Sequence, residues 1–496
     1  MDNNITKKIV SGMKWKMIER LSIQVVNAIT PIVLARLLAP SDFGAVAILT
    51  VFISLANTFV NNGLSGAIIQ RQNADELDCS TVFFTQLGIA LIAYAILFIS
   101  APFIADFYDN AELSIMLRIM SLSIPIGALS SMQMTVLKKN MEFNKSFAAN
   151  VMAMAAYSIV GITAAYCGFG CWSLVLASIA NQVFLFIGAT ATVRWHPHFM
   201  FSLSRLKSLF GYSWKLFVGW MIGTLHQDLY SLVIGKRFSS AMLGFYNRAG
   251  SFPTIILKTV TEIVDGVMFP ALSKVQDEKG KFVEMTKQLL SINAYILFPV
   301  FFGLAATSEN IISILLTDKW LPSAPMMCIM CVTYSLNSLN NSNMQVFNSM
   351  GRSDIFMKFE LIKRSISIAL LLIVSLINIY AVLLVLTAMA VLSNLMNAYQ
   401  NKKLVGISYR EQFSNVIPYF LAAAVMAIAV FFAGRMISSR IVSLAVQLVS
   451  GIIIYGAISV VFKFKPFKEL TSILRIMLIK KEKRINDEKG HGACRE

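Results

Sequence analysis

Charge is scarce in this sequence, and this scarcity argues against a water-soluble protein. Only 14% of the 496 residues are Asp, Glu, Lys or Arg, against roughly 25% in soluble globular proteins. The sequence also lacks GxxxxGK[ST], GxSxG and HExxH motifs, so neither ATP hydrolysis nor a familiar hydrolytic site is indicated. The connections between apolar runs are short, and none is large enough to fold alone.

Cysteine and histidine are few, with six and four residues. Cys167 and Cys171 flank a short turn, which leaves a disulfide in an oxidising compartment open. The "HPH" segment (His196, His198) is better interpreted as a surface loop, because two ligands do not complete a metal site. We therefore expect no metal, no cofactor and no catalytic residue, with a membrane enzyme of polysaccharide synthesis as an open alternative.

Apolar residues dominate instead. They make up 56% of the chain, the mean hydropathy is +0.67, and about 14 runs are long enough to cross a bilayer. The sequence predicts an all-α polytopic membrane protein with about 14 transmembrane helices. The runs lie near residues 13–38, 43–69, 80–105, 112–137, 146–167, 171–193, 206–234, 241–271, 282–306, 323–350, 355–377, 380–400, 412–434 and 440–462.

The net charge of +17 is distributed unevenly along the chain. If the N-terminus is cytoplasmic, Lys and Arg collect on the inside segments and in the tail, whereas the outside loop "PFIADFYDNAE" is acidic. This asymmetry follows the positive-inside rule and predicts that both termini are cytoplasmic. We expect the basic tail to meet anionic lipid headgroups and not nucleic acid.

One hairpin occurs twice. The segment "VLARLLAPSDFGAVAI" (residues 33–48) matches "VIGKRFSSAMLGFYNR" (residues 233–248), with Gly44 aligned to Gly244. Both copies are predicted to join two spans on the outside, so the halves are parallel repeats related by an axis along the membrane normal. We expect two pseudo-symmetric six-helix lobes at residues 1–199 and 200–403, two further helices at 404–463 and a basic cytoplasmic tail at 464–496.

Four segments, taken in order and spacing, resemble a known family. They are the "LARLLAPSDFGAVAI" turn, "ALSKVQDEKGKF", "TDKWLPSAP" and "SMGRSD". Together they are similar to the Wzx-type polysaccharide flippases (O-antigen and exopolysaccharide repeat-unit flippases) of the MOP superfamily. The branch that exports colanic acid and related exopolysaccharides is the most similar.

The resemblance implies a V-shaped transporter that works by alternating access. Its implied substrate is an undecaprenyl-diphosphate-linked oligosaccharide repeat unit, moved from the cytoplasmic to the outer leaflet of the bacterial inner membrane. The implied process is exopolysaccharide or lipopolysaccharide assembly. Coupling to a proton or sodium gradient and partnership with a polysaccharide polymerase stay open.

A lipid-linked sugar needs a polar cavity, positive charge for its diphosphate and an apolar route for its tail. Polar side chains inside spans usually face a cavity or a partner, because exposure to lipid is costly. Amides suit sugar hydroxyls, since they both donate and accept hydrogen bonds. The candidates, which mostly form helical stripes, are Arg20, Gln24, Asn27, Asn57, Asn61, His226, Asp228, Lys258, Glu262, Asp265, Asn337, Asn341, Gln345 and Asn348.

Plain structural roles compete with these assignments. Asn57 and Asn61 can simply hold two helices together, Lys258 can pair with Glu262, and Arg20 can be neutralised by its neighbour. A MATE-like cation-coupled exporter of small molecules is the alternative transporter. Such an exporter typically buries acids in its first two helices, where this sequence offers only one glutamate, beside an arginine.

Overall fold

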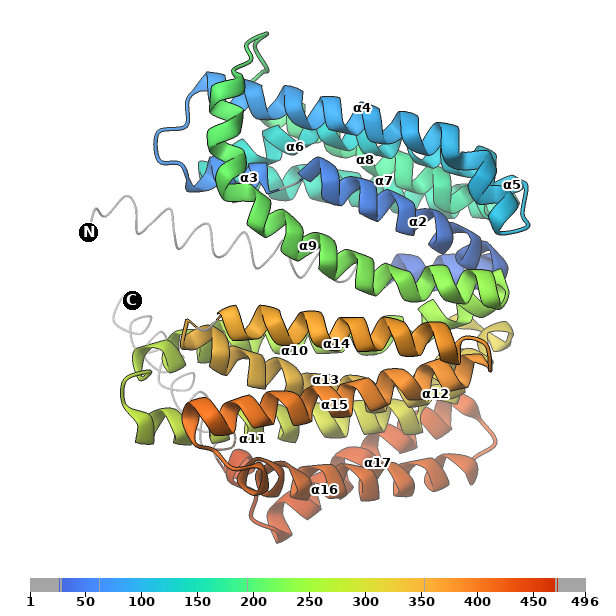
Figure 1. The fold of residues 1–496 in the computed structure, drawn as a ribbon. Helices are drawn as coiled ribbons and strands as arrows, with labels where there is room; N and C mark the ends of the chain where they lie inside the picture. The colour runs from blue at the N-terminus through green and yellow to red at the C-terminus, as the bar shows by residue number, and fades with distance from the viewer. Residues whose placement is uncertain are drawn as a thin grey trace, which may run out of the picture. The chain divides into compact units, whose positions relative to one another are not determined.

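The computed structural model describes residues 26, 29–61, 63–193, 195–351, 353–468 and 471. The described part is helical, without strands (Figure 1). The chain divides into two compact units. The first runs to Asn247 and includes Leu315–Trp320 and Leu371–Ile379, and the second comprises Arg248–Ile314, Leu321–Leu370 and the chain from Tyr380. The division into lobes at residues 199 and 403 stays a prediction.

The first unit contains eight labelled helices joined by short connections. They are α2 (Pro40–Asn61), α3 (Leu64–Gln70), α4 (Glu76–Phe107), α5 (Glu112–Met120), α6 (Ser123–Lys139), α7 (Phe143–Tyr166), α8 (Trp172–Thr192) and α9 (Leu203–Arg237). The helix pairs α7 and α8, α4 and α6, and α2 and α9 pack against each other. The first turns of α10 and the short 3-10 helix η1 (Asp318–Trp320) also belong to this unit.

The second unit is built around α11. Its helices are α10 (Ser240–Lys274), α11 (Lys279–Ala306), α12 (Ser308–Leu316), α13 (Ser323–Ser349), α14 (Ser353–Val374), α15 (Ile379–Val405), α16 (Tyr409–Arg435) and α17 (Arg440–Val461). Helix α11 packs against α13, α16 and α17. An apolar core with Tyr295, Phe298 and Tyr419 joins α11 to α16 and α17.

The expected all-helical membrane architecture is confirmed. Among the described residues, nine helical segments are long and apolar enough to cross a membrane. Helices α9, α10, α13 and α14 also coincide with predicted spans, but they carry more polar residues. Two predicted spans are interrupted: Gly63, with φ of 76°, separates α3 from α2, and Ser121 and Leu122 separate α5 from α6.

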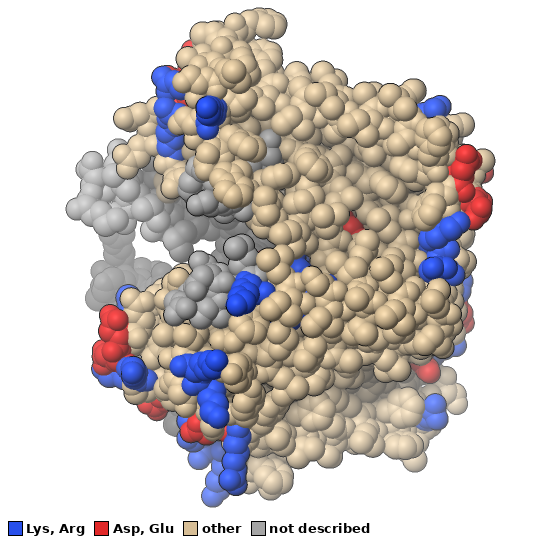
Figure 2. All heavy atoms as spheres, viewed as in Figure 1, with Lys and Arg blue, Asp and Glu red and all other residues tan. Residues whose placement is uncertain are grey.

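The surface has the charge distribution expected of a protein embedded in lipid. Figure 2 shows that Lys and Arg gather near the helix ends, and that the wide surface between them is almost uncharged. Many large apolar side chains are exposed to the surroundings, including Ile99, Ile159 and Ile452. Exposed apolar side chains in such numbers are stable in lipid and unstable in water. The chain is therefore a multi-pass membrane protein.

Ion pairs and a capping side chain stabilise the first turns of α4 and α9, which are predicted to lie on the cytoplasmic side. Asp75 caps α4, and its side chain accepts a 2.8 Å hydrogen bond from the Asp78 backbone N–H. This bond, and more weakly the charge of Arg205, lowers the pKa of the Asp75 carboxyl, against the opposing effect of burial. The buried Asp78 carboxylate pairs with Arg71 at 3.2 Å and with Arg205 at 3.4 Å. These contacts tie the start of α9 to that of α4.

The two copies of the repeated hairpin contact each other within the first unit. A Cβ placed on Gly44 would lie 1.6 Å from the carbonyl oxygen of Ser240, and one on Gly244 would lie 2.0 Å from that of Pro40. Pro40 and Ser240 are the first residues of α2 and α10. Pro40 corresponds to Ser240 and Gly44 to Gly244 in the two copies of the repeat, so exchanging the two copies turns one contact into the other. Two copies related by a two-fold axis are expected to make contacts in such pairs.

The "TDKW" segment covers this crossing. The Trp320 indole N–H donates to the carbonyl of Ala35 at 2.8 Å, and the Lys319 ammonium donates to that of Arg36 at 2.8 Å. These carbonyls lie at the end of a helix, where no intrahelical donor remains for them. The fully buried Trp320 ring meets Phe43 and Phe245 edge-on, at centroid distances of 5.4 and 5.9 Å.

Replacing Gly44 or Gly244 by alanine should therefore destabilise the protein. Alanine gains up to about 1 kcal/mol of helix propensity. A methyl group against a backbone carbonyl, which cannot turn aside, should cost more, about 1–3 kcal/mol. The measurement is the melting temperature of the detergent-purified full chain. Gly66→Ala is the control, because a Cβ there meets nothing within 4 Å, and unchanged melting of Gly44→Ala would contradict the close approach.

Candidate functional site

Three of the predicted candidates lie on α2 and α9, and one of them, Asp228, bonds across the contact between these helices. The Ser54 hydroxyl donates to the Asp228 carboxylate, and Thr58 and Thr224 lie 3.4 Å apart one turn away. His226 meets Tyr230 edge-on at a centroid distance of 5.7 Å. Asn61, at the end of α2, is exposed. The contacts of Ser54 with Asp228 and of Thr58 with Thr224 hold α2 and α9 together. Asp228 therefore has a structural role between these helices.

Asn57 lies elsewhere on α2. Its half-buried side chain lines a cavity together with residues of α7 and α8. It forms no side-chain hydrogen bond with another described residue. The structure therefore gives no sign of the helix-joining role that the sequence left open for Asn57.

Helix α13 carries amides on two faces, and only one of them was expected. On the unexpected face, Asn340 bonds to Asn397, and Asn343 accepts a 2.6 Å bond from Asn401. The Asn293 amide of α11 donates to the hydroxyl of Ser342 beside them. These side chains, all buried except the half-buried Asn340, join α13 to α15 and α11. The spacing of asparagines in "NLMNAYQN" on α15 was the signal that could have revealed them.

The expected stripe on α13 is more open. Asn337, Asn341 and Gln345 are half-buried and Asn348 is exposed. None of the four forms a side-chain hydrogen bond with another described residue. Within the described part of the chain, the structure thus separates amides that hold helices together from amides that have no side-chain partner.

The candidates on α10 are only partly described. Lys258 and Glu262 are exposed, and Lys258 forms no ion pair with a described residue. The alternative in which these two side chains pair is therefore not seen. Arg20, Gln24 and Asn27 lie outside the described residues, and so does the side chain of Asp265.

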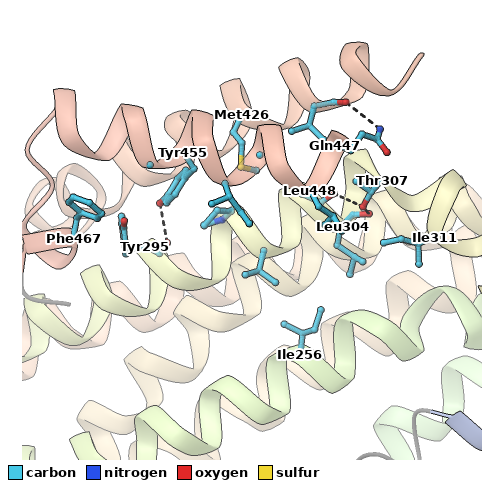
Figure 3. Close-up of a pocket in the computed structure, with 17 residues that line it drawn as sticks. Ile256, Tyr295, Leu304, Thr307, Ile311, Met426, Gln447, Leu448, Tyr455 and Phe467 are labelled. Carbon is cyan, nitrogen blue, oxygen red and sulfur yellow. Dashed lines mark hydrogen bonds between the residues drawn. The ribbon is translucent and has the colours of Figure 1, made fainter. Parts of the chain in front are cut away.

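Sequence reasoning did not place the apolar site. A groove of about 550 Å³ lies on the second unit among α11, α16 and α17, as Figure 3 shows. Leu304, Met426 and Leu448 line it. Gly456, which has no side chain, contributes to the open volume of the groove, because a Cβ placed on it would meet nothing within 4 Å.

The polar groups along this groove already have partners. The Tyr455 hydroxyl donates to the backbone carbonyl of Tyr295 at 3.0 Å, and the Tyr295 hydroxyl donates to Ser459 at 3.1 Å. Gln447 accepts a 2.8 Å bond from the Asn310 amide. A surface whose hydrogen bonds are satisfied offers only apolar contact, so the groove suits a hydrocarbon chain.

The described residues contain no cluster of three or more His, Cys, Asp or Glu side chains that could hold a metal ion. Cys167 and Cys171 are free thiols. The Cys171 sulfur lies 3.7 Å from the sulfur of Met116. The disulfide that the sequence left open is therefore not formed.

Comparison with known proteins identifies a family. A family model described as "Polysaccharide biosynthesis protein" matches residues 33–325, more than half of the chain. The lipopolysaccharide biosynthesis protein WzxC of Escherichia coli (strain K12) is 26% identical over 366 residues, which are 73% of this chain and 74% of WzxC. The succinoglycan biosynthesis transport protein ExoT of Rhizobium meliloti (strain 1021) is 24% identical over 357 residues, 72% of each chain.

The fold is also that of a known transporter. The structure is similar to that of the lipid II flippase MurJ in an inward closed conformation, with a TM-score of 0.77. The match covers 92% of this chain and all of MurJ, at 14% sequence identity. At this identity the likeness shows the architecture alone.

Proposed function

The chain belongs to the polysaccharide biosynthesis protein family, and we propose that it is a flippase for lipid-linked oligosaccharides. It moves repeat units carried on undecaprenyl diphosphate from the cytoplasmic to the outer leaflet of the bacterial inner membrane, for exopolysaccharide or lipopolysaccharide assembly. The transfer proceeds by alternating access. Both termini are cytoplasmic. The names of WzxC and ExoT, which refer to polysaccharide synthesis and transport, support this function.

The apolar groove on α11, α16 and α17 is the observation that carries this proposal. A substrate on a polyprenyl carrier has a long hydrocarbon tail that must follow its head group through the transport cycle. The groove offers apolar contact over about 550 Å³ with its own polar groups already bonded. A small polar drug would gain little from such a surface, because it could not replace its hydrogen bonds to water.

Several of the predicted polar candidates are assigned to the sugar and diphosphate of the head group. The α13 stripe offers amide donors and acceptors for sugar hydroxyls. Lys258 is exposed and free of an ion pair with a described residue, so its charge is available to a diphosphate. Arg20 is assigned the same role on the first span. The family match favours this substrate over the small cations of a MATE-like exporter.

Loss of the protein should stall complete lipid-linked repeat units on the cytoplasmic side. The experiment is a deletion strain in which lipid-linked intermediates are extracted, sized by mass spectrometry and tested for access to a glycosidase added outside. Full-length, protected intermediates are expected. Truncated intermediates would indicate a missing synthetic step and would favour the membrane enzyme instead.

Filling the groove should slow export in proportion to the volume added. In a hydrophobic pocket each methylene is worth about 1–3 kcal/mol, so Gly456→Ala should be mild, and Gly456→Leu and Gly456→Trp should lower export about tenfold or more. The readout is surface polysaccharide at matched protein level. Val449→Trp on the same helix is the control, because Val449 is exposed but does not line the groove. Equal export by all of these variants would remove the groove from the substrate path.

Neutralising Lys258 should also lower export. Lys258→Gln removes a charge-assisted contact to phosphate, which is about twice as strong as a neutral one, whereas Lys258→Arg keeps the charge. The matched control is Lys274→Gln at the end of the same helix, which also changes an exposed lysine. If Lys258→Gln and Lys274→Gln export equally well, Lys258 does not bind the diphosphate.

A further inference from the structure

The first unit contains a second, polar cavity, apart from the groove. It measures about 330 Å³ and lies among α2, α6, α7 and α8, and it is also lined by Val26, Thr30 and Pro31. This volume is at the lower end of the range for ligand pockets in proteins, about 300–1,000 Å³. All of its described walls belong to one compact unit.

Three amides line this cavity without partners. Asn57, Asn181 and Gln182 are half-buried, and none forms a side-chain hydrogen bond with a described residue. The buried Gln133 of the same unit behaves differently: Gln133 and Thr190 exchange bonds of 3.1 and 3.2 Å. Amides inside a membrane-embedded unit are costly unless they are bonded. The three amides thus mark a place where no described residue of the chain supplies their side-chain hydrogen bonds.

Hydroxyls complete the lining. The Ser178 hydroxyl donates to the carbonyl of Leu174 at 2.8 Å and keeps its lone pairs as acceptors. Thr30 and Ser123 add two more hydroxyls. No charged side chain lines the described part of the cavity, whereas Met154 and the ring of Tyr157 supply apolar surface.

This combination identifies the ligand class by exclusion. A phosphate needs a cation and an organic cation needs an acid, and the described walls offer neither. A hydrocarbon would leave the amides unbonded. An uncharged sugar ring has hydroxyls that both donate and accept around its edge and apolar C–H faces, which match the amides and the methionine and tyrosine surfaces.

We propose that this cavity binds an uncharged sugar residue of the transported glycan, through Asn57, Asn181 and Gln182. The proposal rests on the proposed function and adds to it. The cavity holds one or two rings, not a whole repeat unit, so it selects for the sugar that enters it. Charged sugars are rejected there, because their carboxylates would lose water without gaining a cation.

The test measures protection of the cavity directly. Met154→Cys, which lines the cavity but is not one of the three amides, is introduced into the full chain with its native cysteines replaced, and labelling by N-ethylmaleimide is followed in membranes. Glucose, galactose and N-acetylglucosamine at high concentration are the probes, with glucuronate and tetraphenylphosphonium as charged comparisons. At least one uncharged sugar should slow labelling at least about twofold, and the charged probes should not. Asn150→Cys, on α7 outside the cavity, should be unaffected by any probe.

A second measurement uses export. Asn181→Leu keeps the size of the side chain but removes its hydrogen bonds, and should lower export about tenfold, as expected for an unmet bond to a polar group. Asn181→Gln keeps an amide and should export better. No protection by any uncharged sugar, or equal protection by tetraphenylphosphonium, would overturn the proposal. The deletion experiment is independent: if complete intermediates still accumulate there, the flippase function stands although the sugar cavity has failed.

Discussion

The backbones of α2 and α10 approach each other closely at Gly44 and Gly244. The packing at the end of the first unit that is predicted to lie outside depends on this approach. Only glycine allows a helix to lie against a carbonyl at this distance. Because α2 and α10 cross there, Trp320 can reach over both and donate to the end of the preceding helix. The repeated hairpin and the "TDKW" segment, far apart in sequence, are thus parts of one structure.

A second constraint explains how the polar residues are distributed. A polar group inside a membrane protein is costly without a hydrogen-bond partner, and the described residues include amides that have such a partner and amides that do not. Asn401 donates to Asn343 between two helices and Asn310 donates to Gln447 beside the groove, whereas the amides of the α13 stripe form no side-chain hydrogen bond with a described residue. Residue type alone does not separate these classes. The separation comes from which helix each side chain faces.

The fold was largely predictable, because run length and hydropathy are properties of contiguous sequence. Predicted spans such as 440–462 and 323–350 differ from α17 and α13 by a residue at most. The breaks at Gly63 and at Ser121 were missed, because a single residue that interrupts a helix hardly changes the mean hydropathy of a run. The repeat was visible in sequence, but the contact of its two copies was not.

The sites were less predictable for a geometric reason. The groove needs α11 beside α16 and α17, more than a hundred residues later, and no local pattern records that neighbourhood. On α13, spacing by three and four residues fits both Asn337 with Asn341 and Asn340 with Asn343, so periodicity could not tell which face was buried. Gln182 and Asn181 were overlooked because two polar residues in an apolar run form no stripe.

The paired glycine contacts also constrain how the protein can move. Pro40 and Gly44 lie one turn apart on α2, and their partners Gly244 and Ser240 lie one turn apart on α10. Rigid helices cannot release one contact while keeping the other, so the crossing has two states, made or broken, without a half-open form. A substitution at either glycine would therefore disturb both contacts at once, because the symmetry of the two hairpins makes the contacts a single cooperative unit.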